Sequence, residues 1–179
     1  MTLVNSDTGV KICESDDFGY GGLAMAVSDL DADPTTDEVV FSPLHDQVNH
    51  VSQPARPTLR VLRVVASGSG HAFAPVASLP LSGPQDIAPS CVCGLAVADF
   101  GTGTARKVYI VVTTLNGELL VYAWDPVNAQ FGALVHSQIV EGSLGAYNSI
   151  LIHDLSTTNG AKPELYIAGS RGMRRWDFL

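Results

Sequence analysis

Hydrophobic residues make up 46% of the 179-residue chain and charged residues 16%, with a net charge of −8 at pH 7. This balance excludes a disordered chain, and the length is sufficient for one ordinary core. The negative charge opposes binding to the phosphate backbone of nucleic acids. No apolar run approaches the roughly 20 residues of a membrane-spanning helix. We therefore expect a folded domain that binds no nucleic acid and does not insert into a membrane.

The sequence carries few localisation signals. Its first residues lack a basic stretch followed by an apolar one, so no signal peptide is expected. The compartment stays open: cytoplasmic, or extracellular if the sequence is part of a longer chain. The odd number of cysteines, Cys13, Cys91 and Cys93, argues against a closed disulfide framework.

Strand-length apolar runs, separated by Gly, Pro, Asn and Asp, follow one another along the chain, and no stretch keeps a helical period. The first predicted strand covers residues 10–14. Three similar segments follow at residues 23–44, 94–115 and 149–170. Such internal similarity indicates a repeat architecture.

Each of these segments opens with a short strand that ends in Asp followed by a large apolar residue. The three aspartates are Asp29, Asp99 and Asp154, which lie 70 and 55 residues apart. In each segment a polar loop follows, and then a second apolar strand. The common order of strand, polar loop and strand identifies the segments as copies of one unit.

Further strands complete the repeat. In the second and third repeats the third strand ends in Trp-Asp, at Trp124 and Trp176. A fourth strand is predicted over residues 72–81 and 131–140. Repeated units of four antiparallel strands are typical of β-propeller blades.

We therefore predict an all-β, β-propeller-like domain over residues 1–179, built from about three four-stranded antiparallel blades. The repeats cover about 20–82, 91–142 and 146–179, and the strand at 10–14 could complete another blade. Three blades cannot close a ring. The ring is thus incomplete, and we expect a piece of a larger propeller, a subunit that assembles one with partner chains, or an open stack of sheets. A β-sandwich is the alternative fold, since many short strands suit both.

The first acidic loop reads DLDADPTTD, and with it the repeat resembles the FG-GAP family of propeller blades, found in integrin α-subunit heads. The family pattern is D-x-D/N-x-D-G-x-x-D between two apolar strands. The first repeat matches it at Asp29, Asp31, Asp33 and Asp37, with Pro34 in place of the glycine. The other two loops keep fewer of these acidic residues. The resemblance implies a blade fold.

Asp29, Asp31, Asp33 and Asp37 are the candidate metal ligands. Calcium takes six to eight oxygen ligands, and alternating carboxylates in a tight loop can converge on one ion. A structural calcium ion that pins the hairpin is one interpretation. The other is a solvated acidic turn, in which the aspartates accept hydrogen bonds from nearby backbone N–H groups.

No catalytic constellation stands out, since the chain has no nucleophile elbow, phosphate loop or HExxH motif. We expect a non-enzymatic binding or scaffold module that mediates protein–protein interaction through propeller loops. It would be completed by oligomerisation or by a partner chain. Lectin-like carbohydrate binding, which the resemblance implies for some family members, is one alternative, and an accessory subunit of an enzyme complex is another.

Overall fold

The computed structural model describes residues 1–15, 24–31, 33, 35–42, 58–81, 92–100, 106–114, 117–139, 149–153, 164–169 and 172–177. Within these residues all regular structure is β, with thirteen strands in four antiparallel sheets, none of them closed into a barrel. The prediction of an all-β fold is confirmed. In this part of the chain no helix has the length and apolar character that a membrane span requires.

Sheet 1 and sheet 2 each contain four strands that pair in chain order. The strands of sheet 1 are β3 (Ala24–Ser28), β4 (Glu38–Ser42), β5 (Thr58–Ser67) and β6 (Gly70–Pro80). Those of sheet 2 are β7 (Val92–Phe100), β8 (Lys107–Thr114), β9 (Glu118–Asp125) and β10 (Gln130–Ile139). Both sheets are therefore antiparallel meanders that match the predicted first and second repeats.

Sheet 3 has three described strands, β11 (Ser149–His153), β12 (Glu164–Gly169) and β13 (Gly172–Asp177), again paired in chain order. It matches the third repeat. Asp154 and the loops that follow Asp99 and Asp154 lie outside the described residues, as does Cys91.

The N-terminal residues form a separate two-stranded sheet of β1 (Thr2–Val4) and β2 (Lys11–Glu14). The side-chain oxygen of Asn5 accepts hydrogen bonds from the backbone N–H groups of Asp7 and Thr8, which shapes the turn between the strands. The strand predicted at residues 10–14 is thus present. In the described part of the chain it pairs within its own hairpin and not with one of the three larger sheets.

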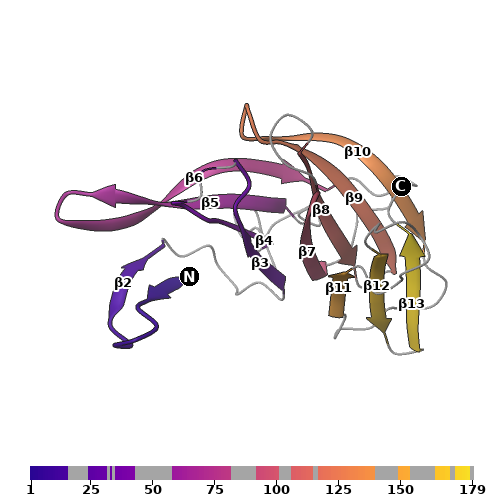
Figure 1. Cartoon of the computed structure of the whole chain (residues 1–179), viewed down its shortest axis with the longest axis horizontal. Helices are drawn as coiled ribbons and strands as arrows, with labels where there is room; N and C mark the ends of the chain where they lie inside the picture. Colours follow the sequence, from indigo (N-terminus) through magenta and orange to yellow (C-terminus); the bar gives the residue numbers. More distant parts are fainter. Residues whose placement is uncertain are drawn as a thin grey trace, which may run out of the picture.

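The three larger sheets stack in chain order. The first strands of neighbouring sheets lie together, with β7 between β3 and β11, and the last strands of sheets 1 and 2, β6 and β10, also contact each other. Figure 1 shows β7 near the centre, with β3 and β4 on one side and β11 to β13 on the other. Sheet 2 is consequently covered on both faces.

Two apolar cores fill the spaces between the sheets. Along β8, Val108 and Ile110 point into the core between sheets 1 and 2, whereas Val111 points into the core between sheets 2 and 3. Because successive side chains of a strand face opposite sides, a strand buried on both faces has no polar alternation. This explains the continuous apolar run of β8.

Gly94 allows β7 to approach its neighbours closely. A Cβ atom at this position would overlap the hydroxyl of Thr113 and lie 3.1 Å from the side chain of Ile150 in β11. The close packing of sheet 2 on sheet 3 therefore requires a residue without a side chain here.

Candidate functional site

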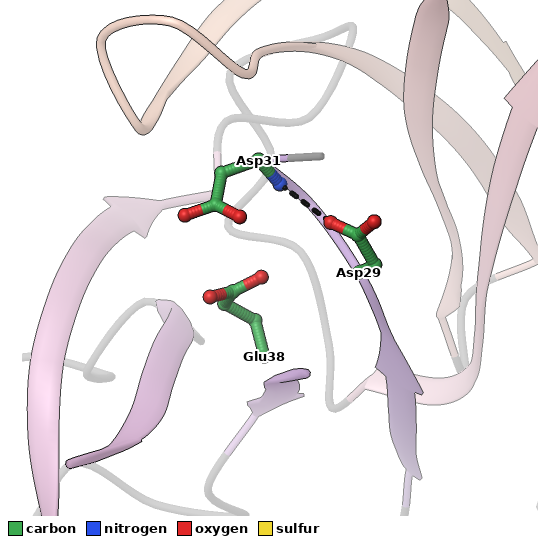
Figure 2. A group of neighbouring side chains, drawn as sticks. All are labelled: Asp29, Asp31 and Glu38. Atoms are coloured by element: carbon green, nitrogen blue, oxygen red, sulfur yellow. Dashed lines mark hydrogen bonds between the residues drawn. The ribbon is translucent and has the colours of Figure 1, made fainter. Parts of the chain in front are cut away.

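The predicted acidic loop lies at the end of β3 and returns to the start of β4. Asp29 and Asp31 follow β3 directly, and Glu38 is the first residue of β4. One carboxylate oxygen from each of these three residues lies within 4.8 Å of the others, and we call this group the carboxylate cluster (Figure 2). Asp29 also accepts a 3.1 Å hydrogen bond from the backbone N–H of Asp31. Two of the four predicted ligands are thus together, joined by a glutamate that the sequence analysis did not select.

Asp33 and Asp37 lie outside the carboxylate cluster, and both are exposed. The carboxylate of Asp33 accepts hydrogen bonds from the backbone N–H and the hydroxyl of Thr35, at 3.0 and 2.6 Å, and from the hydroxyl of Thr36 at 3.2 Å. These bonds, the Thr35 hydroxyl first, hold the pKa of Asp33 below its usual value. This part of the loop matches the second interpretation of the sequence, an aspartate that shapes its own turn.

Arg63 supplies a positive charge to the carboxylate cluster. Its Nε donates a 2.5 Å hydrogen bond to Glu38, and its Nη2 forms an ion pair with Asp31. The hydrogen bond to Glu38 holds the pKa of Arg63 above its usual value. Glu38 is fully buried, and its second oxygen accepts a 2.8 Å bond from the backbone N–H of Leu30. Both oxygens of this buried carboxylate are therefore satisfied.

Two side chains of the second repeat, one just before β8 and one in β9, also hold the loop. Arg106 binds the carboxylate of Asp99 at 2.8–3.0 Å and donates a 2.6 Å hydrogen bond to the backbone carbonyl of Asp29. The indole Nε1 of Trp124 donates a 2.9 Å hydrogen bond to the carbonyl of Leu30. The loop of the first repeat is thus tied to the second by contacts that no local sequence pattern contains.

Glu38 has a counterpart in the third repeat. Glu164 is the first residue of β12, as Glu38 is of β4, and both are fully buried. In the strand register Glu38 lies opposite Ser28 and Glu164 opposite His153, the residues that precede the first and third repeat aspartates. A glutamate at the start of the second strand in two repeats is the sequence signal that would have identified this position.

The donor set of the carboxylate cluster fits calcium in type, because carboxylate oxygens are hard ligands. The guanidinium of Arg63, however, already contacts Asp31 and Glu38. A calcium ion bound by all three carboxylates would have to share those oxygens with Arg63 or displace it. Calcium at this loop therefore stays a prediction.

The sequence matches no protein-family model and no curated protein. The resemblance to FG-GAP blades rests on the sequence pattern of strand, aspartate-bearing loop and apolar strand, and it likewise stays a prediction.

Proposed function

We propose that the chain is a non-catalytic binding and scaffold module in which sheets 1, 2 and 3 act as propeller blades. The outer faces of sheets 1 and 3 would be covered by further copies or by a partner chain. The arrangement of the strands supports this, since first strands lie beside first strands and β6 lies beside β10. Stacked meanders with their first strands together are the architecture of a propeller.

The observation that carries the proposal is exposed apolar side chains at both ends of the stack. At the sheet 1 end they lie along β3, since their register partners on β4, Phe41 and Val39, are buried. On β3, Met25 and Val27 are each 58% exposed and point away from sheet 2. On β11 and β13, Leu151 is 52% and Met173 69% exposed, again on the face away from sheet 2. Grouped apolar side chains on an otherwise polar surface mark interaction sites.

The native mass of the purified chain, measured by light scattering over a range of concentrations, tests this proposal. We expect an assembly larger than one chain, and a lower mass for Val27→Lys, which places a charge on the outer face of sheet 1. Val127→Lys is the matched control, because Val127 is 89% exposed in the turn between β9 and β10. A monomer at every concentration, with no co-purifying protein, would contradict the proposal.

A structural calcium ion at the carboxylate cluster is a second proposal, favoured by the three converging carboxylates. It would hold the β3–β4 hairpin and leave the binding role to the outer faces. Carbohydrate binding and an accessory role in an enzyme complex have no described contact in their favour, and they stay alternatives. Stabilisation of the purified chain by added sugars would support the first of these alternatives.

A further inference from the structure

The first strands of the three larger sheets lie together inside the chain. β7 contacts both β3 of sheet 1 and β11 of sheet 3, and Figure 1 shows these two strands on opposite sides of it. Equivalent strands therefore meet at both junctions, between sheets 1 and 2 and between sheets 2 and 3. A contact that is made twice by equivalent strands indicates how a further sheet would join the stack.

The side chains four and two positions before the repeat aspartate face the preceding sheet. In β7 these side chains are Leu95 and Val97, which pack on the core between sheets 1 and 2. In β11 they are Ile150 and Ile152, which pack on the core between sheets 2 and 3. All four are half-buried. We call the side of a first strand that carries these two positions its receiving face.

The receiving face of β3 is exposed. Met25 and Val27 hold the two equivalent positions before Asp29, and each is 58% exposed. Sheet 2 lies on the opposite side of β3, where Ala24 packs on the shared core. β3 therefore presents to solvent the same two apolar positions that β7 and β11 place against a neighbouring sheet.

The side chain three positions before the repeat aspartate faces the following sheet. In β3 this residue is Ala26, opposite Val40, and in β7 it is Ala96, opposite Val111. Directly opposite residues share a face, and the two valines belong to the core between sheets 1 and 2 and the core between sheets 2 and 3, respectively. In β11 the equivalent residue is Leu151, which is 52% exposed. We call this side of a first strand its forward face.

The chain thus exposes one first-strand face of each kind, the receiving face of β3 and the forward face of β11. Neither strand contains Asp, Glu, Lys or Arg, although the chain carries a net charge of −8. Contact between the two faces would bury apolar surface, which is favourable. It would remove none of these four side-chain types of the two strands from water, which would be costly. The two exposed faces are therefore complementary in position and in chemistry.

We propose that a second copy of the chain binds here, with the forward face of its β11 against the receiving face of β3. Leu151 of one copy then lies against Met25 and Val27 of the next, and the first strands meet as they do inside the chain. At the sheet 1 end the contact is confined to β3, because Val39 and Phe41 of β4 are already buried. This inference rests on the proposed function as a binding module and names the partner of its exposed faces.

Two charge substitutions test the two faces separately. Val27→Lys alters the receiving face and Leu151→Glu the forward face, and both side chains are more than half exposed, so both variants should fold, as circular dichroism can check. Each variant alone should associate at least ten-fold more weakly than the unaltered chain, because a charge would be buried at the contact. Light scattering measures this as the mass of one chain at concentrations where the unaltered chain is assembled. Val127→Lys should assemble normally.

A mixture of the two variants tests whether unlike faces meet. In the mixture, the unaltered Leu151 of the first variant can meet the unaltered Val27 of the second, and the introduced lysine can meet the introduced glutamate. An equimolar mixture should therefore recover the mass of at least two chains, although neither variant assembles alone. A mixture that stays at the mass of one chain would overturn the inference.

Dilution of the unaltered chain supplies a measurement that needs no variant. The NMR signals of the methyl groups of Met25, Val27 and Leu151 should shift over the concentration range in which the mass falls, whereas those of Val127 should not. A response confined to β3 or to β11 would contradict the contact between them.

The outcomes separate this inference from the proposed function. Assembly that only one of the two substitutions abolishes would mean that like faces meet, which refutes the pairing of β11 with β3 and leaves the scaffold role intact. A chain that is monomeric but co-purifies with another protein refutes the second copy and keeps the binding role. A monomer with no co-purifying protein contradicts both.

Discussion

The indole Nε1 of Trp124 donates a 2.9 Å hydrogen bond to the backbone carbonyl of Leu30, although 94 positions separate the two residues in the sequence. Both residues are buried; Leu30 lies in the loop between β3 and β4 of sheet 1, and Trp124 lies in β9 of sheet 2. The bond fixes the acidic loop of the first repeat against the third strand of the second. It therefore connects the position of the carboxylate cluster to the stacking of sheets 1 and 2.

Replacement of this donor should destabilise the fold. Trp124→Phe keeps a ring beside Phe131 but leaves the buried carbonyl of Leu30 without this partner, at an expected loss of about 1–3 kcal/mol in the free energy of unfolding. Trp176→Phe is the matched control, because the Nε1 of Trp176 donates a longer, exposed bond of 3.3 Å to Gln138. Chemical denaturation measures both. An equal loss in the two variants would contradict the structural role of the Trp124 bond.

Removal of Arg63 should leave a buried charge without its cation. In Arg63→Met the fully buried carboxylate of Glu38 loses its ion pair, and we expect the free energy of unfolding at neutral pH to fall by about 3 kcal/mol. The additional change Glu38→Gln should recover part of this loss, because the neutral amide has no charge to desolvate. Lys11→Met breaks an exposed ion pair with Glu14 and should have little effect. A double variant less stable than Arg63→Met would refute this explanation.

The pKa of Asp33 should depend on Thr35. Because that pKa lies below its ordinary value of 3.8 in the folded chain, the ionised carboxylate stabilises the fold above this value. The stabilisation is lost as pH falls through the folded pKa. In Thr35→Ala the pKa should rise toward the ordinary value, so stability should depend less steeply on acidic pH. NMR titration of the carboxyl group measures the pKa, and Thr36→Ala should raise it less.

A side chain at Gly94 should separate sheets 2 and 3. In Gly94→Ala the new methyl group would overlap Thr113 and press on Ile150, and overpacking of this kind costs about 1–3 kcal/mol. Thermal unfolding measures the loss. Gly132→Ala is the control, because a Cβ atom there meets Ala123 at an ordinary 3.4 Å. The same melting temperature for Gly94→Ala and the unaltered chain would contradict the close approach of β7 to β11.

Calcium and Arg63 should compete for the same carboxylates. If calcium binds at the cluster, Arg63→Gln should bind it more tightly than the unaltered chain, and Asp31→Asn more weakly, since the cation that contacts Asp31 is removed in the first and a ligand in the second. Isothermal titration calorimetry measures both affinities. If neither substitution changes the affinity for calcium, the ion binds at another place in the chain.

The strands could be predicted because they are local. The third strands of the first two repeats, Thr58–Ser67 and Glu118–Asp125, begin and end where their apolar runs and turn residues indicate. The aspartate that ends the first strand of each repeat also predicted where the acidic loop of the first repeat begins. Such features depend on residues that are close together in the sequence, so they can be predicted from the sequence alone.

The carboxylate cluster depends on contacts that the sequence does not display. Glu38 joins it instead of Asp37 because the pairing of β4 with β3 turns one residue inward and its neighbour outward. Arg63 comes from the third strand of the sheet, and Arg106 reaches Asp29 from the next sheet. Only the pairing and stacking of the sheets bring these charges together, so the loop pattern alone could not identify them.

The two ends of the stack are different patches of the chain, one carrying Met25 and Val27 and the other Leu151 and Met173. Copies that join one end to the other would therefore make heterologous, head-to-tail contacts, not the isologous contact of a two-fold dimer. Each added copy would then be rotated relative to the previous copy by the same angle, and this angle decides the kind of assembly. A rotation that divides the full circle evenly closes a ring of fixed size, and any other rotation extends a helical filament.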